Sequence, residues 1–268
     1  MKIATVTYSK GLAYGLVKMT KVQAVKEILN NVEADFILFP GHSLNSLKDL
    51  EKVAQNITAP VNALLEVKEM YVFGAKRFNN LFMARNGVVR NMHTSQLFST
   101  SSEIQGNREL AEWLLTDLEQ RRGFSIIGKR FLILDCGENN ILRNVRSDGN
   151  RARFRFDDDK ELAARFEAVI NNTDIVLNPT HTALGELGVM TKRMAWLSEN
   201  ERYYFTTTNA IQVIVDHKTG DTKRNRLLLD SKILHYAFHN GEKIESICDP
   251  QENEKDKKPY RIEYYDVK

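Results

Sequence analysis

The sequence contains few of the residues that mark several classes of protein. Its 268 residues include 2 Cys, 5 Pro and 14 Gly. Two cysteines cannot build a disulfide framework, and so little Pro and Gly excludes collagen-like and low-complexity chains. Apolar runs are only a few residues long, whereas a membrane-spanning helix needs roughly 20. Because 42% of the residues are hydrophobic, the chain is typical of a globular protein with a sizeable core.

An excess of charge of either sign is also lacking. The 38 basic and 35 acidic residues leave a net charge of +3, which is too balanced to predict nucleic-acid binding by itself. One cluster of arginines is either a cationic strand face that binds an anion or a nucleic-acid backbone, or a solvated sheet edge. Its members are Arg143, Arg146, Arg151, Arg153 and Arg155. Nearby aspartates at 157–159 offset their field, so the solvated edge is favoured and nucleic acid is not expected as a partner.

The first residues, Met1 to Val6, resemble a strand and not a signal peptide. Together with free thiols at Cys136 and Cys248, this predicts a cytoplasmic protein without a membrane partner. His235 and His239 would share one face of a helix, as metal ligands do, but the polar–apolar alternation around them fits a strand better. We therefore expect no metal ion and no other cofactor.

Strand-like and helical patterns alternate along the chain, which predicts an α/β fold. Residues 21–31 carry apolar side chains at helical spacing, and the apolar run 131–134 is typical of a strand covered on both faces. Other strands are predicted near 3–8, 36–39, 71–74, 81–84, 88–89, 174–177, 203–208, 213–215 and 227–229, and other helices near 48–55, 102–118, 160–170 and 191–200. We expect one domain over residues 1–246. A polar connector and an extended tail over residues 247–268 would follow, with the tail pairing with a neighbouring sheet or subunit.

Cys136 is the main candidate for a catalytic residue in this sequence. It follows the apolar run 131–134 and precedes Gly137 and several polar residues. Because the carboxyl ends of strands in an α/β sheet face the functional crevice, a thiol there suits a nucleophile beside an oxyanion site. A small buried side chain at a strand end is the alternative.

Four segments, in order, resemble motifs of the carbon–nitrogen hydrolase (nitrilase/amidase) superfamily. Residues 34–40 resemble a strand that ends in Phe-Pro-Glu, and residues 79–98 resemble paired strands around an Asn-Gly turn that lead to a lysine. Residues 134–139 resemble the nucleophile elbow. Residues 174–209 resemble a strand, a helix with Glu-Asn and a strand that ends in Asn. The resemblance extends over roughly residues 1–245.

This resemblance implies a four-layer α-β-β-α sandwich that assembles as a homodimer. It also implies a glutamate base, a lysine that stabilises the tetrahedral intermediate and a cysteine that forms a thioester. Cys136 matches the cysteine, but Gly41 stands at the glutamate position. The lysine position falls on Asn91, Ser95 or Gln96, depending on the alignment.

Two interpretations follow from these departures. In the first, the site is rebuilt, with His42 or His93 as the base for Cys136, although the neighbour of position 41 on a strand would point to the opposite face. Glu103 matches a further glutamate of the family, and it or Glu138 would orient groups in the pocket.

The pocket of such an enzyme would be lined by Asn139, Gln96 and His181, which follows a strand end. Its substrate would be a small amide or nitrile. In the second interpretation catalysis is lost and the fold binds a ligand or a partner, since similarity of fold does not establish activity.

Overall fold

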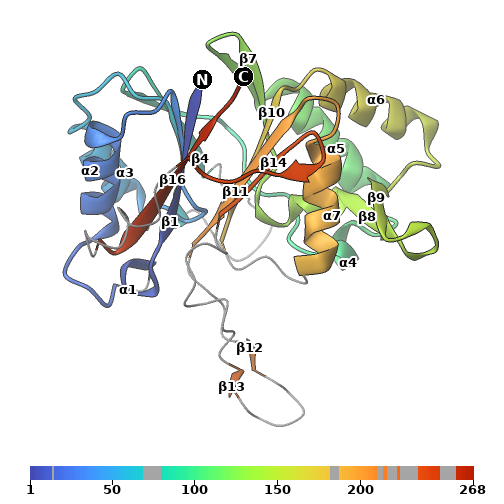
Figure 1. The fold of residues 1–268 in the computed structure, drawn as a ribbon, viewed down its shortest axis with the longest axis horizontal. Coiled ribbons are helices and arrows are strands. Elements are labelled where there is room, and N and C mark those ends of the chain that lie inside the picture. The colour runs from blue at the N-terminus through green and yellow to red at the C-terminus, as the bar shows by residue number, and fades with distance from the viewer. Residues whose placement is uncertain are drawn as a thin grey trace.

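The computed structural model describes residues 1–13, 15–68, 80–181, 187–209, 214–215, 222–223, 235–247 and 258–268. Two six-stranded sheets lie face to face, with α2 and α3 outside one sheet and α5, α6 and α7 outside the other (Figure 1). This arrangement confirms the predicted α/β fold and its four-layer α-β-β-α sandwich.

The first sheet has the strand order β16-β1-β2-β3-β4-β5. Its strands are β1 (Lys2–Tyr8), β2 (Phe36–Leu38), β3 (Ala63–Glu66), β4 (Leu81–Arg85), β5 (Val88–Asn91) and β16 (Tyr260–Asp266). Strands β1, β2 and β3 run parallel. The helices of this half are α1 (Lys10–Ala13), α2 (Lys21–Asn31) and α3 (Leu47–Ala54). Helix α2 matches its prediction because Thr20 and Gln23 form a capping box that defines its first turn.

The second sheet has the strand order β15-β14-β11-β10-β7-β6. Its strands are β6 (Gly123–Ile126), β7 (Lys129–Ile133), β10 (Ile175–Thr180), β11 (Tyr203–Thr208), β14 (His235–His239) and β15 (Glu242–Lys243). Strands β7, β10 and β11 run parallel. The helices are α4 (Ser101–Ile104), α5 (Arg108–Gln120), α6 (Lys160–Asn171) and α7 (Leu187–Leu197), with 3-10 turns η2 (Cys136–Ile141) and η3 (Arg146–Asp148). Two short ribbons are β8 (Leu142–Val145) with β9 (Arg151–Phe154), and β12 (Ile214–Val215) with β13 (Thr222–Lys223).

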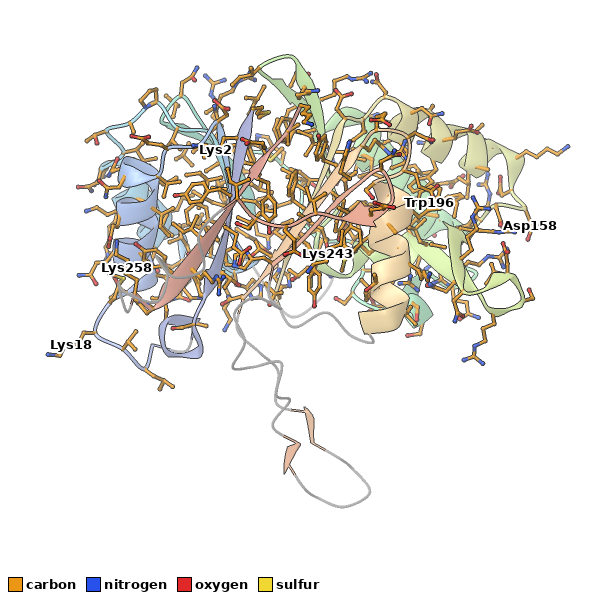
Figure 2. All side chains as sticks on the ribbon, in the orientation of Figure 1. Lys2, Lys18, Asp158, Trp196, Lys243 and Lys258 are labelled. Carbon is orange, nitrogen blue, oxygen red and sulfur yellow. The ribbon has the colours of Figure 1, made fainter. Side chains whose placement is uncertain are left out.

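Apolar side chains fill the spaces between all four layers (Figure 2). Phe36 from the first sheet packs against Phe131 from the second, with ring centroids 5.1 Å apart. Burying one such aromatic side chain contributes on the order of 2 kcal/mol, so this central layer holds the two sheets together. None of the described helices is long and apolar enough to cross a membrane.

The structure differs from the predictions at the C-terminal tail, at His235 and at strand β3. The tail at 260–266 is β16, which pairs along its length with β1 of the same chain and so belongs to the first sheet. His235 lies on a strand as predicted, but it is buried and its Nδ1 is 2.7 Å from Thr5 Oγ1, whereas an exposed face was expected. Strand β3 was not predicted. The strands predicted near 71–74 and 227–229, and residue 213 of the strand predicted near 213–215, lie outside the described residues.

Candidate active site

Polar side chains from both sheets meet at the carboxyl ends of four parallel strands. His42 follows β2, Glu66 ends β3, Cys136 follows β7 and His181 follows β10. The N–H of Gly41 donates to the carbonyl of Thr180 at 3.1 Å and ties the two sheets together at this edge. Loops at such an edge commonly form the crevice of an α/β protein, because side chains from several strands converge there.

Cys136 begins the 3-10 turn η2, and Asp135 is the capping residue in front of it. The Cys136 sulfur accepts a hydrogen bond from the backbone N–H of His181 at 3.3 Å. Gly137 is required next to it, because a Cβ at this position would collide with the backbone of Ser99. The thiol is half-buried, so it is held in place and still reachable.

His181 links the thiol to a buried carboxylate. Its Nε2 lies 2.7 Å from both carboxylate oxygens of Glu66. Burial opposes the charged imidazolium, but the Glu66 carboxylate and hydrogen bonds to Cys136 and Glu66 raise the pKa of His181 to about 12. His181 is therefore protonated and positively charged at neutral pH, and it contacts both the Cys136 thiol and the Glu66 carboxylate.

Glu66 is held by donors from three directions. Besides His181, its carboxylate accepts hydrogen bonds from Asn80 Nδ2 at 2.7 Å and from the backbone N–H of His42 at 3.0 Å. Its side chain is only 1% exposed. Burial acts to raise the pKa of Glu66, but His181 and His42 lower it below its ordinary value. A carboxylate so placed can fix the orientation and the charge of His181.

His42 reaches the site by way of a turn. Strand β2 ends at Leu38, and His42 has a positive φ of 54°, so its side chain returns toward Glu66 rather than pointing to the opposite face as the strand argument predicted. Its ring stacks on that of His181 with centroids 3.8 Å apart, and its Nε2 is 3.9 Å from Glu66 Oε1. Burial lowers the pKa of His42 to about 4, helped by His181. His42 is thus neutral beside a charged neighbour.

Two further ionisable groups border these residues. Asp135 is fully buried, and desolvation together with the Glu66 carboxylate raises its pKa to about 8. Lys21 Nζ donates to the carbonyl of His42 at 2.8 Å, and burial lowers its pKa to about 8. Both groups therefore change charge slightly above neutral pH. Asp135 and Lys21 thus add two titratable groups next to the thiol and the histidines.

Three residues predicted to be catalytic have other contacts. His93 is exposed, with a φ of 56°, and lines a surface hollow beside Trp113. Glu103 caps α4, where it accepts from the N–H of Ser99 at 2.5 Å. Glu138 is fully buried and forms an ion pair with Arg122, so it braces the turn that carries Cys136.

Two of the predicted pocket residues are also engaged within the protein. Asn139 is fully buried and donates to Asn178 Oδ1 at 2.9 Å and to Tyr204 Oη at 2.7 Å. Gln96 is buried and donates to the carbonyl of Phe98 at 2.8 Å. Both side chains support the loops around Cys136 instead of facing an open site.

Glu66 is the residue that sequence reasoning missed. Its signal was a short apolar run, 63–65, that ends in a single acid. His42, Glu66 and His181 are also the group of described residues whose ligand atoms lie within 4.8 Å of one another, as a metal ion requires. A metal ion there would have to displace the proton that Glu66 holds on His181, so the donor set suits proton transfer better.

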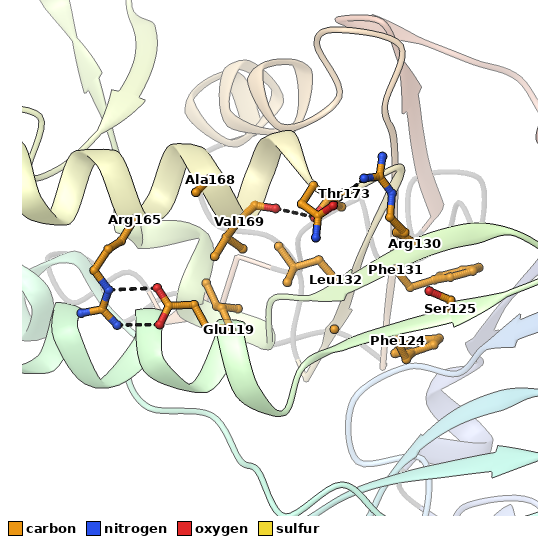
Figure 3. Close-up of a pocket in the computed structure, with 13 residues that line it drawn as sticks. Glu119, Phe124, Ser125, Arg130, Phe131, Leu132, Arg165, Ala168, Val169 and Thr173 are labelled. Carbon is orange, nitrogen blue, oxygen red and sulfur yellow. Dashed lines mark hydrogen bonds and ion pairs between the residues drawn. The ribbon is translucent and has the colours of Figure 1, made fainter.

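A separate cavity of about 480 Å³ lies between α5, α6 and the β6–β7 pair (Figure 3). Its lining includes Leu118, Phe124 and Leu132, together with Arg165 and Glu119, which form a bidentate ion pair. Its lining includes none of the residues that meet at Cys136.

Two solved structures are similar in fold to this chain over its full length. A glutamine-dependent NAD(+) synthetase from Cytophaga hutchinsonii has a TM-score of 0.52 at 12% identity, covering 100% of this chain and 43% of the synthetase. XC1258 from Xanthomonas campestris, a CN-hydrolase superfamily protein with an arsenic adduct in its active site, has a TM-score of 0.50 at 12% identity, covering 100% of this chain and 90% of its own. No family model and no curated protein sequence matches the chain.

These likenesses show the fold: the chain has the sandwich fold of the CN-hydrolase protein XC1258, as its motifs predicted. At 12% identity they establish the fold. The chain spans 43% of the length of the synthetase, so the activity of that whole protein is not transferred to it.

Proposed function

We propose that the protein cleaves the C–N bond of a small amide through a Cys136 thioester, with His181 as the acid and base and Glu66 as its orienting carboxylate. The observation that carries this proposal is the position of His181: its backbone N–H donates to the Cys136 sulfur, and its imidazole, which the buried Glu66 carboxylate holds, also hydrogen-bonds to Cys136. This Cys–His–Glu arrangement replaces the glutamate and lysine that the resemblance implied.

The imidazole of His181 gives or takes each proton that the reaction needs. The Cys136 thiolate attacks the carbonyl carbon, and the imidazolium of His181 gives its proton to the departing amine nitrogen as the C–N bond breaks. A water molecule then attacks the thioester while neutral His181 takes its proton, which releases the acid and regenerates the thiolate–imidazolium pair. An amine in place of water would give acyl transfer.

The electrostatics favour this proposal over a purely structural role. A buried ion pair contributes little net free energy to folding, because the cost of desolvating both groups offsets their attraction. A half-buried thiol with a charged histidine beside it is, by contrast, an arrangement typical of a reactive cysteine. The alternative, a fold that only binds a ligand or partner, needs none of these contacts.

The test is the rate of iodoacetamide alkylation at Cys136 between pH 5 and pH 9, followed by mass spectrometry with Cys248 as the internal reference. We expect Cys136 to alkylate at pH 6 at least about tenfold faster than Cys248, because an ordinary thiol is mostly protonated there. The substitution Glu66→Gln should lower that rate about 100-fold, since it removes the charge that holds the proton on His181.

Glu119→Gln is the matched control, because it removes a carboxylate from an exposed pair far from this site. A panel of amides and nitriles, with ammonia release as the readout, then tests turnover. Alkylation of Cys136 no faster than that of Cys248 would exclude the thiolate pair and favour the binding role.

A further inference from the structure

Arginines gather where β8 and β9 pack against α7 (Figure 1). Arg143 comes from β8, Arg155 follows β9 and Arg193 lies in α7. Arg143 pairs with Asp157 at 2.5 Å and approaches the exposed Asp158 at 3.9 Å. Arg155 and Arg193 have no carboxylate partner among the described residues.

The contacts of Arg193 are all to uncharged groups. Its Nε donates to Asn144 Oδ1 at 2.8 Å, and its Nη1 donates to Asn140 Oδ1 at 2.7 Å and to the carbonyl of Asn139 at 3.4 Å. The same Nη1 lies 4.0 Å from the sulfur of Met190. Arg193 is 6% exposed, so its charge is largely removed from water.

Arg155 is half-buried and is held in the same way. Its Nε donates to the carbonyl of Asn140 at 2.8 Å and its Nη2 to the carbonyl of Leu142 at 3.2 Å. Burial lowers the pKa of both arginines, to about 10 for Arg193. The positive charge of Arg143 lowers the pKa of Arg155 further, and that of Arg155 lowers the pKa of Arg193. The cluster is short of negative charge.

Arg122, which is fully buried, shows how carboxylates can compensate the charge of a buried arginine. Arg122 has two carboxylates, those of Glu138 and Asp117. A desolvated guanidinium without a counter-charge is costly, and hydrogen bonds to neutral carbonyls compensate only part of that cost. The five contacts of Arg155 and Arg193 to backbone carbonyls and side-chain amides brace residues 139–144, but they leave two adjacent positive charges uncompensated.

We propose that Arg155 and Arg193 bind the oxyanion of a small ligand, a carboxylate or a phosphate group. Planar guanidinium groups match the geometry of these oxyanions, and a bound anion would supply the charge that the described residues lack. Asn140 accepts from Arg193 and donates through its Nδ2 to the carbonyl of Gly137 at 2.8 Å, so the cluster lies next to the turn that carries Cys136. Resting on the proposed function, this makes the substrate an amide that bears such a group.

Calorimetric titration tests the site without relying on catalysis. Inorganic phosphate and succinate are each titrated into the wild-type protein and into Cys136→Ser at constant ionic strength. We expect saturable binding of one probe with Kd below about 1 mM in both proteins. The stronger probe identifies the phosphate or the carboxylate as the preferred group.

Substitutions then locate the binding. Arg155→Gln should weaken it at least tenfold, because the half-buried side chain can be replaced without opening the core, and Arg193→Lys should weaken it while keeping a positive charge. Arg165→Gln, which removes an arginine from an exposed pair, should leave it unchanged. No saturation by either probe, or equal weakening by Arg165→Gln, would overturn the anion site. Loss of Cys136 reactivity would overturn the proposed function and leave this binding intact.

Discussion

The ring of His181 occupies the space that a side chain at Gly41 would need. A Cβ built on Gly41 would lie 2.8 Å from the carbonyl carbon of Thr180 and 2.9 Å from Glu66 Oε2, and closer still to His181 Cδ2. Real Cβ atoms essentially never approach other atoms within 3.0 Å. The resemblance implies a glutamate at position 41. The glycine found there leaves the space in which His181 and Glu66 can form their pair.

Gly41→Ala should therefore displace His181 and disable the site. We expect Cys136 alkylation at pH 6 to fall about 10- to 100-fold, because a displacement of about 1 Å in a reactive group has effects of that size. Gly188→Ala is the control, since a Cβ there meets nothing within 4 Å. An alanine at position 41 with wild-type reactivity would show that His181 is not constrained by this contact.

Glu138→Gln should lower the free energy of unfolding by about 3 to 5 kcal/mol, because it leaves the fully buried Arg122 short of one charge. Urea unfolding followed by fluorescence measures the change. Glu119→Gln breaks the partly exposed pair with Arg165 and should cost at most about 1 kcal/mol. Equal costs for the two substitutions would contradict the assigned burial of the Arg122–Glu138 pair.

His235 should make the protein less stable in mild acid. Burial lowers its pKa in the folded protein to about 3, whereas an unfolded histidine has a pKa of about 6.5. Between these values the unfolded chain binds the extra proton, so stability falls as the pH falls, by about 1.4 kcal/mol per pH unit.

The variant His235→Gln cannot take up this proton. Between pH 7 and pH 5 it should lose about 2 kcal/mol less unfolding free energy than the wild type does. Urea titrations at both pH values measure the difference. The substitution His239→Gln, at a partly exposed histidine, is the control for replacing a histidine by glutamine. A wild-type dependence in His235→Gln would assign the acid sensitivity to other groups.

Local patterns predicted much of the fold. Helix α2 was predicted over residues 21–31, because the helical spacing of its apolar side chains is contained within the segment itself. Strand β3 was missed, because four residues of the type Ala-Leu-Leu-Glu have no preference strong enough to distinguish a strand from a loop or a helix. Glu66 was missed with it.

At the candidate active site, too, the sequence predicted some features and missed others. The sequence by itself determined that Cys136 follows a buried strand and precedes a glycine, since both features are adjacent in the chain. Only the tertiary structure decided its partners: Glu66 and His181 are separated by 115 residues and belong to different sheets, and the turn at His42 has a positive φ that local propensity does not predict. Contacts of this kind depend on how the two sheets pack and on strand register, which are set by the whole core rather than by neighbouring residues.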